Sequence, residues 1–242
     1  MIGVPFILVS FFFFWSLDTM KTVMPPRGNH TPDIIVTGHQ WWWEASYPGT
    51  KVVTANEIHI QAGKPFLLQL NAADVIHDWW VPAFGAKMDM IPGMDNFLWT
   101  TISKPGIYEG ACSEFCGQQH AWMRIRVIAE DSVSYFEWLR KQSSSADSSS
   151  LNGKTGADLF DGSSCSSCHN ITGTPATGRQ GPDLTHFASR QTMLAGMLEN
   201  NPENLTRWLT DPQFVKPGAK MPRFIFGKDS IQALVAYLEK LK

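Results

Sequence analysis

The chain has 242 residues, which is long enough for two domains of ordinary size, and 43% of its residues are hydrophobic against 17% charged. This balance is typical of a folded protein. The formal net charge is −2 and no cluster of lysine and arginine occurs, so the composition excludes nucleic acid as an expected partner.

The chain begins with an apolar stretch, residues 2–17, which carries no charge and is closed by Asp18 and Lys21. Sixteen helical residues span about 24 Å, against about 30 Å for the hydrocarbon core of a bilayer. A signal peptide would have a basic start and a small-residue cleavage site, and neither is present. We therefore expect residues 1–24 to form a transmembrane helix, truncated at its start; a signal peptide and a buried helix are the alternatives.

Residues 25–141 show a rhythm of short strands separated by Gly, Pro and Asn turns. The strand-like runs are EIHI (57–60), PFLLQLN (65–71), FLWTTI (97–102) and MRIRVIA (123–129). Such a rhythm predicts an all-β domain, an antiparallel sandwich or barrel, and the run 131–142 has the spacing of a closing helix.

A Ser-rich segment, residues 142–152, has nothing to bury and is expected to be a flexible linker. Residues 153–242 are helical in pattern and predict an all-α domain. The last helix of that domain presents one apolar face made of Ile231, Leu234, Val235, Leu238 and Leu241.

The second half of the chain carries the motif CSSCH, from Cys165 through Cys168 to His169. This is the pattern of covalent haem c attachment, in which two thiols form thioethers and the histidine is the proximal iron ligand. A thioredoxin-like site and a zinc site are the alternatives, but this half has no second Cys/His pair to complete a zinc site.

The sixth iron ligand is expected to be Met221, which lies in the Gly/Pro-bounded loop PGAKMP. His/Met ligation raises the haem potential, which suits an electron carrier. Met193 and Met197 compete for this role, but their spacing favours one apolar face of a helix. Pro182 is expected to offer its carbonyl to the free ring nitrogen of His169.

The loop GACSEFCGQQHAWM gathers Cys112, Cys116, His120 and Met123, all soft or borderline metal ligands. Such a set on a β scaffold favours copper. Two thiolates on one loop can bridge two copper ions if each copper also takes an imidazole, and His77 is the best candidate for the second one. Zinc and a disulfide are the alternatives, and Met123 favours copper over zinc.

The run VIHDWWVPAFGAKMDMIPG followed by GACSEFCGQQHAWM, and preceded by GHQWWW, resembles subunit II of the haem–copper cytochrome c oxidases. The CSSCH domain is similar to the cytochrome c that is fused to this subunit in the caa(3) type. The resemblance covers nearly the whole chain. It implies a cupredoxin-like domain with a binuclear copper centre, CuA, and a class I cytochrome c domain.

The resemblance also implies roles for single residues. The copper ligands would be Cys112 and Cys116 as bridges, His77 and Met123 on one copper, and His120 and the backbone carbonyl of Glu114 on the other. The side chain of Glu114 would face a magnesium ion shared with the catalytic subunit. Trp41 would be the point at which electrons arrive, whereas Trp42 and Trp43 are expected in the core or at the membrane interface.

By this resemblance the chain is part of a membrane-bound terminal oxidase and passes electrons from haem c to CuA and on to a catalytic subunit that reduces oxygen to water. The implied partners are subunit I, other membrane subunits, and an electron donor that is a cytochrome or an upstream respiratory complex. The expected location is the bacterial cytoplasmic membrane, with both domains on the outer face. A nitric oxide reductase subunit and a copper-delivery protein are the alternatives. The other histidines are expected to be structural or exposed: His30, His39, His59 and His186.

Overall fold

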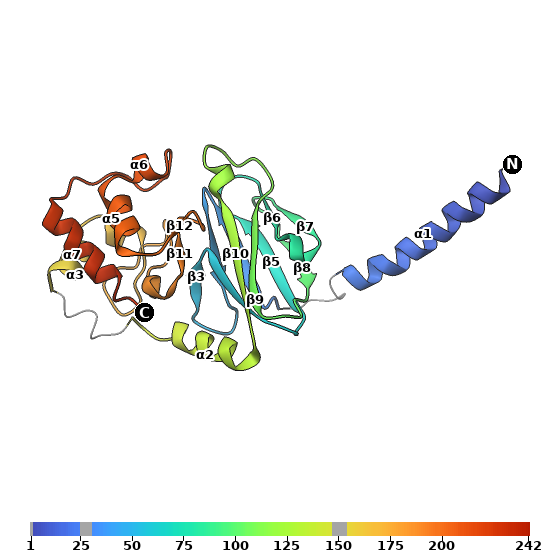
Figure 1. Ribbon diagram of the computed structural model, residues 1–242, viewed down its shortest axis with the longest axis horizontal. Helices are drawn as coiled ribbons and strands as arrows, with labels where there is room; N and C mark the ends of the chain where they lie inside the picture. Colours follow the sequence, from blue (N-terminus) through green and yellow to red (C-terminus); the bar gives the residue numbers. More distant parts are fainter. Residues whose placement is uncertain (1, 25–30, 147–153) are drawn as a thin grey trace.

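The computed structural model describes residues 2–24, 31–146 and 154–242, which form an N-terminal helix, a sheet-rich domain and a helical domain (Figure 1). Helix α1 is Gly3–Val23 and continues past Asp18, so that its 21 residues extend about 32 Å. Its stretch Gly3–Lys21 is long and apolar enough to cross a membrane, and the large apolar side chains on it are exposed. By length, α1 matches the hydrocarbon core of a bilayer.

The sheet domain consists of two five-stranded sheets. The first has the order β3-β2-β1-β5-β8, with β1 Ile34–His39, β2 Trp42–Ser46, β3 Val53–Ala55, β5 Phe66–Ala72 and β8 Asn96–Thr100. The second has the order β4-β10-β9-β6-β7, with β4 Glu57–Gln61, β6 His77–Trp80, β7 Lys87–Met90, β9 Gly106–Cys112 and β10 Arg124–Glu130. Two 3-10 turns, η1 Pro82–Phe84 and η2 His120–Trp122, lie in the connections.

The sandwich is mixed rather than purely antiparallel. Strand β1 pairs in parallel with β5, and β10 pairs in parallel with β4, whereas the other pairs in these two sheets are antiparallel. Parallel neighbours need a crossover connection, and the chain between β1 and β5 supplies one by passing through β2, β3 and β4. The predicted antiparallel arrangement is therefore wrong for these two pairs of strands, because local alternation cannot reveal such a crossover.

The core of this domain lies between the two sheets. Strand β1 alternates buried and half-buried residues, as a strand with one face in a core must. Trp43 and Trp79 are fully buried and meet edge to face. Helix α2, Ser132–Gln142, is capped by Asp131 and packs Trp138 flat on the ring of His59.

The helical domain is built from α3 Lys154–Asp161, α4 Cys165–Cys168, η4 Phe187–Ser189, α5 Pro202–Thr210, α6 Pro212–Val215 and α7 Lys228–Leu238. It also contains a two-stranded ribbon, β11 Thr192–Met193 and β12 Leu198–Glu199. The helical interpretation of Met193 and Met197 is therefore wrong, because Leu194 and Ala195 have positive φ and turn the chain back.

The two domains are in contact in the described residues. The buried carboxylate of Glu57 on β4 accepts hydrogen bonds from the backbone N–H groups of Gln191 and Thr192 and from the Thr192 hydroxyl. The side chain of Gln119 donates to the carbonyl of Pro217. Most of the predicted linker lies outside the described residues; within its described part, the carbonyl of Ser144 contacts the ring of His186.

Candidate functional site

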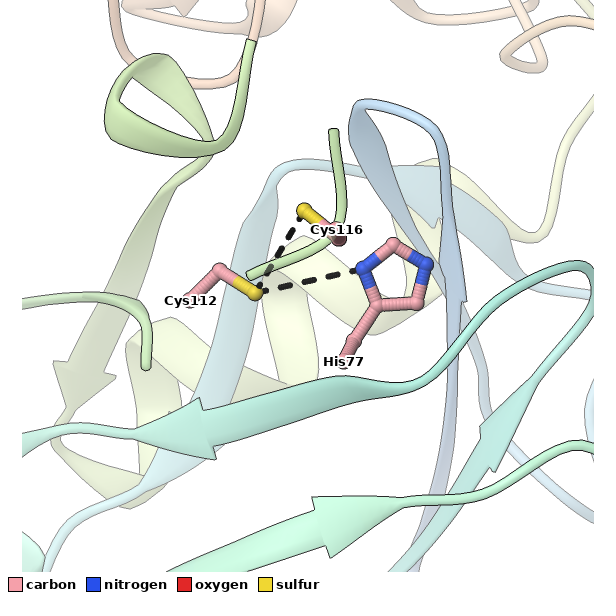
Figure 2. A group of neighbouring side chains, drawn as sticks. All are labelled: His77, Cys112 and Cys116. Carbon is pink, nitrogen blue, oxygen red and sulfur yellow. Dashed lines mark hydrogen bonds between the residues drawn. The ribbon is translucent and has the colours of Figure 1, made fainter. Parts of the chain in front are cut away.

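The first site lies at one end of the sandwich, where β6 begins and β9 ends. His77 Nδ1 is 3.9 Å from Cys112 Sγ, and Cys112 Sγ is 3.8 Å from Cys116 Sγ. All three residues are buried, and their ligand atoms lie within 4.8 Å of one another. Figure 2 shows the two sulfurs converging on one ring nitrogen of His77, while the other ring nitrogen points away.

The rest of the predicted copper set surrounds these atoms. His120 Nδ1 is 3.6 Å from Cys116 Sγ, and Met123 Sδ is 3.8 Å from the same sulfur. The backbone carbonyl of Glu114 is 3.2 Å from Cys112 Sγ. The structure therefore brings together every residue that the sequence assigned to this site, with donor atoms of a chemistry that fits copper.

The two thiols influence each other strongly. The hydrogen bond between Cys112 and Cys116, helped by the one between Cys112 and His77, lowers the pKa of Cys112 to about 3. The neighbouring Cys112 sulfur and burial in turn raise the pKa of Cys116 far above the ordinary thiol value. Two adjacent buried thiolates repel each other, so holding both in the ionised form requires a cation between them. This pocket is thus suited to a metal that ligates both sulfurs.

Asp74 orients the ring of His77, a role that the sequence did not predict. Its carboxylate accepts from His77 Nε2 at 2.9 Å, which leaves Nδ1 directed at the sulfurs. Burial would raise the pKa of Asp74, but hydrogen bonds from His77, the N–H groups of Gln40 and Val75, and Lys220 lower it to about 2. The carboxylate is therefore ionised at neutral pH.

The second site is a mostly apolar cavity of about 320 Å³ between the helical domain and the sheet domain, and its helical side is lined by Cys165, Cys168, His169 and Met221. Helix α4 places the two cysteines three residues apart on one face. His169 Nδ1 donates to the carbonyl of Pro182 at 2.7 Å, so that its other ring nitrogen is the one left for a metal. Burial lowers the pKa of His169, which favours the neutral, ligating form. Thiols, imidazole and thioether around one apolar cavity fit a covalently attached haem.

One wall of this cavity belongs to the sheet domain. His39, Trp41 and Trp42 line it, and the rings of His39 and Trp42 stack 4.2 Å apart. The sequence predicted a structural or exposed His39 and a core or membrane-interface Trp42. It did not predict that both residues line this cavity. The Trp41 indole N–H donates to the carbonyl of Cys116 at 3.0 Å, so Trp41 touches both the cavity and the copper loop.

The other histidines have structural contacts where they are described. His59 Nδ1 is 2.9 Å from Glu130, and His186 Nε2 is 3.1 Å from the carbonyl of Ser144. His30 lies outside the described residues.

A soft-metal site on a sandwich and a haem-type cavity on its flank define the class of protein as one with two candidate metal centres. Residues 51–130 match the family described as the periplasmic domain of cytochrome c oxidase subunit II, and residues 153–242 match cytochrome c. The chain belongs to the cytochrome c oxidase subunit 2 family. This membership implies copper in the sheet domain and haem c in the helical domain, and it confirms the predicted fold class.

Similar proteins carry the same family name. Cytochrome c oxidase subunit 2 of Alkalihalophilus pseudofirmus is 37% identical over 90% of this chain and 64% of its own length. The same subunit of Bacillus sp. strain PS3 is 32% identical over the whole chain and 70% of its own length. The chain thus spans about two thirds of these relatives. The crystal structure of the periplasmic domain of subunit II of cytochrome oxidase from Bradyrhizobium japonicum is 32% identical and covers 50% of this chain and 100% of its own, with a TM-score of 0.46.

Proposed function

We propose that this chain receives electrons at a covalent haem c, passes them to a binuclear CuA centre, and delivers them to the catalytic subunit of a cytochrome c oxidase that reduces oxygen to water. The observation that carries the proposal is a shared wall: Trp41 lines the cavity that holds the CSSCH motif and donates to the backbone of Cys116 in the copper loop.

The copper ligands proposed are those on which the site converges. Cys112 and Cys116 would bridge the two ions, with His77 and Met123 on one copper and His120 and the Glu114 carbonyl on the other. The support is the set of short distances around the two sulfurs, together with the hydrogen bond from Asp74 that directs His77 inward. Two coppers bridged by thiolates supply a centre that takes up one electron with little change in bond length.

The haem would be attached to Cys165 and Cys168 and ligated by His169 and Met221. Its proximal imidazole is held by the Pro182 carbonyl. Gly181 leaves room for the ring, because a Cβ there would lie 2.5 Å from His169 Cε1. These contacts would hold the imidazole in position as a ligand of the haem iron.

The partner proposed for the copper loop is the catalytic subunit, with other membrane subunits around it. Glu114 and Phe115 are exposed beside the thiols, and Phe115 presents a 76% exposed apolar side chain. The Glu114 carboxylate would hold the shared magnesium. Helix α1 would anchor the chain in the bacterial cytoplasmic membrane with both domains outside, where haem c is attached and a cytochrome or upstream respiratory complex supplies electrons.

Oxygen uptake tests this function. The complex that copurifies with the chain from detergent-solubilised membranes should consume oxygen with an electron donor, and cyanide should stop it. A complex with haem c and CuA spectra but no oxygen uptake would assign the chain to another acceptor.

Flash reduction of the haem tests the route through Trp41. The Trp41→Ala variant should keep both metal spectra and transfer electrons from haem to CuA more slowly. Trp80→Ala is the matched control, because Trp80 is 40% exposed and does not line the haem cavity. An unchanged rate in Trp41→Ala would reject the route.

A further inference from the structure

One carboxylate contacts both halves of the molecule. Asp74 Oδ1 accepts from His77 Nε2 at 2.9 Å, and its Oδ2 accepts from the backbone N–H of Gln40 at 2.8 Å and from Lys220 Nζ at 3.1 Å. His77 and Gln40 belong to the sheet domain, whereas Lys220 belongs to the helical domain. The same side chain therefore orients a copper ligand and receives a cation from the haem domain.

The cation comes from the segment that carries the sixth haem ligand. Lys220 directly precedes Met221, and the chain just before it is fixed to the sheet domain at two further points. Lys216 is buried and donates to the carbonyl of Trp41 at 3.1 Å, and Gln119 donates to the carbonyl of Pro217 at 2.6 Å. We name residues 216–221 the ligand segment. Through Lys216, this segment contacts Trp41 in the turn between β1 and β2, beside the copper site.

We expect the Lys220–Asp74 ion pair to change the charge next to His77 more than it strengthens the docking of the two domains. Their side chains are 59% and 21% exposed, and ion pairs of that exposure add little to stability. Asp74, however, is hydrogen-bonded to the ring of a metal ligand, and such a carboxylate raises the electron-donor strength of the imidazole. An ammonium on the same carboxylate draws negative charge away from His77 and lowers that donor strength.

We propose that Asp74 is a positioning residue that couples seating of the haem domain to the copper centre: when the ligand segment docks, Lys220 neutralises Asp74, weakens electron donation by His77, and raises the reduction potential of CuA. The inference rests on the proposed function, since it takes His77 and Met221 as ligands. Its consequence is that copper accepts an electron more readily while the haem is in place to give one.

Spectroelectrochemistry of the full chain, loaded with haem and copper in detergent, tests the coupling. Lys220→Met should lower the CuA potential, and Lys220→Arg should restore it because a guanidinium also pairs with a carboxylate. Lys64→Met is the matched control: Lys64 is 60% exposed and pairs at 4.0 Å with Asp33, which precedes the far end of β1. It should leave both potentials unchanged.

A double-mutant cycle separates the coupling from a general loss of positive charge. In an Asp74→Asn background, Lys220→Met should no longer move the CuA potential, although it still moves the haem potential through its place beside Met221. An equal CuA shift in both backgrounds would overturn the proposal, as would a Lys220→Met shift no larger than that of Lys64→Met.

Failure of the proposed function would give a different experimental result from failure of the coupling through Asp74. A chain that shows no mixed-valence CuA spectrum or no haem c spectrum would remove the ligands themselves. If both spectra are intact and only the potentials fail to respond to Lys220, the proposed function stands and the coupling through Asp74 is rejected.

Discussion

Replacing Gly38 with alanine should disturb the copper site although none of its proposed ligand residues is changed. Gly38 lies on β1 directly beneath the ring of His77, and a Cβ there would lie 2.9 Å from His77 Cδ2 and 3.1 Å from Cγ. Carbon atoms in good contact are about 3.5 Å apart, so the ring or the strand would have to shift by about 0.6 Å. Metal–ligand distances tolerate about 0.2 Å.

Little space exists to absorb that shift. The same Cβ would lie 3.2 Å from Cζ3 of the fully buried Trp43. Moving the His77 ring also strains its 2.9 Å hydrogen bond to Asp74. Overpacking of this kind costs about 1–3 kcal/mol of unfolding free energy, and loss of a partner that orients a metal ligand costs about 10- to 100-fold in metal affinity. Gly38→Ala should therefore hold copper more weakly.

Copper per haem, measured by metal analysis and by the near-infrared CuA band at limiting copper, is the assay. Because the haem would be attached covalently, its absorbance measures the amount of chain in the sample. Gly227→Ala is the control, because that glycine lies in the helical domain with φ −67°, and a Cβ added to it would have no atom within 4 Å. Full copper occupancy with an unshifted band in Gly38→Ala would refute the argument that close packing on His77 fixes its geometry.

Three further outcomes are expected. Gly181→Ala should displace the His169 ring, seen as a loss of the low-spin haem spectrum and gain of carbon monoxide binding; an unchanged spectrum would contradict the packing argument. Glu57→Ala should weaken docking by about 1.5–3 kcal/mol and speed amide exchange at Thr192, whereas unaltered protection there would contradict it. Burial lowers the pKa of Lys216 from 10.5 to about 8, so the docked state binds fewer protons than the undocked state over this range. Docking should therefore strengthen as pH rises from 8 to 10.5, measured by the same amide exchange, and Lys216→Met should remove that dependence. Docking that weakens over this range would refute the argument.

The residues that converge at the two candidate sites could be predicted from the sequence, because metal chemistry restricts both residue type and spacing. Cys112, Cys116, His120 and Met123 lie within one loop, and Cys165–His169 is a contiguous motif, so local sequence carries most of the information. Only His77 had to be assigned to the first site from a distant part of the sequence, and the structure places its Nδ1 3.9 Å from Cys112 Sγ. The alternating strands likewise predicted the sandwich.

Residues whose role depends on contacts made only in the folded chain could not be identified from residue type and spacing. Asp74 is one acid among 22 Asp and Glu residues, and only the fold places its carboxylate between His77 and Lys220. His39 becomes part of the haem cavity only when the helical domain is seated against it. The hairpin at Met193 was missed because its apolar spacing also suits a helix, and the positive φ of non-glycine residues cannot be read from composition.

The two-residue turn between β1 and β2 ties the two centres together. The Gln40 and Trp41 side chains both donate to the carbonyl of Cys116, at 2.8 and 3.0 Å, and the Gln40 N–H donates to Asp74. The Trp41 carbonyl accepts from Lys216 of the ligand segment. A shift of the helical domain that displaces this turn therefore also displaces Cys116 and Asp74, the hydrogen-bond partner of His77. Because these contacts share Gln40 and Trp41, we expect the position of the helical domain to affect the geometry around Cys116 and His77.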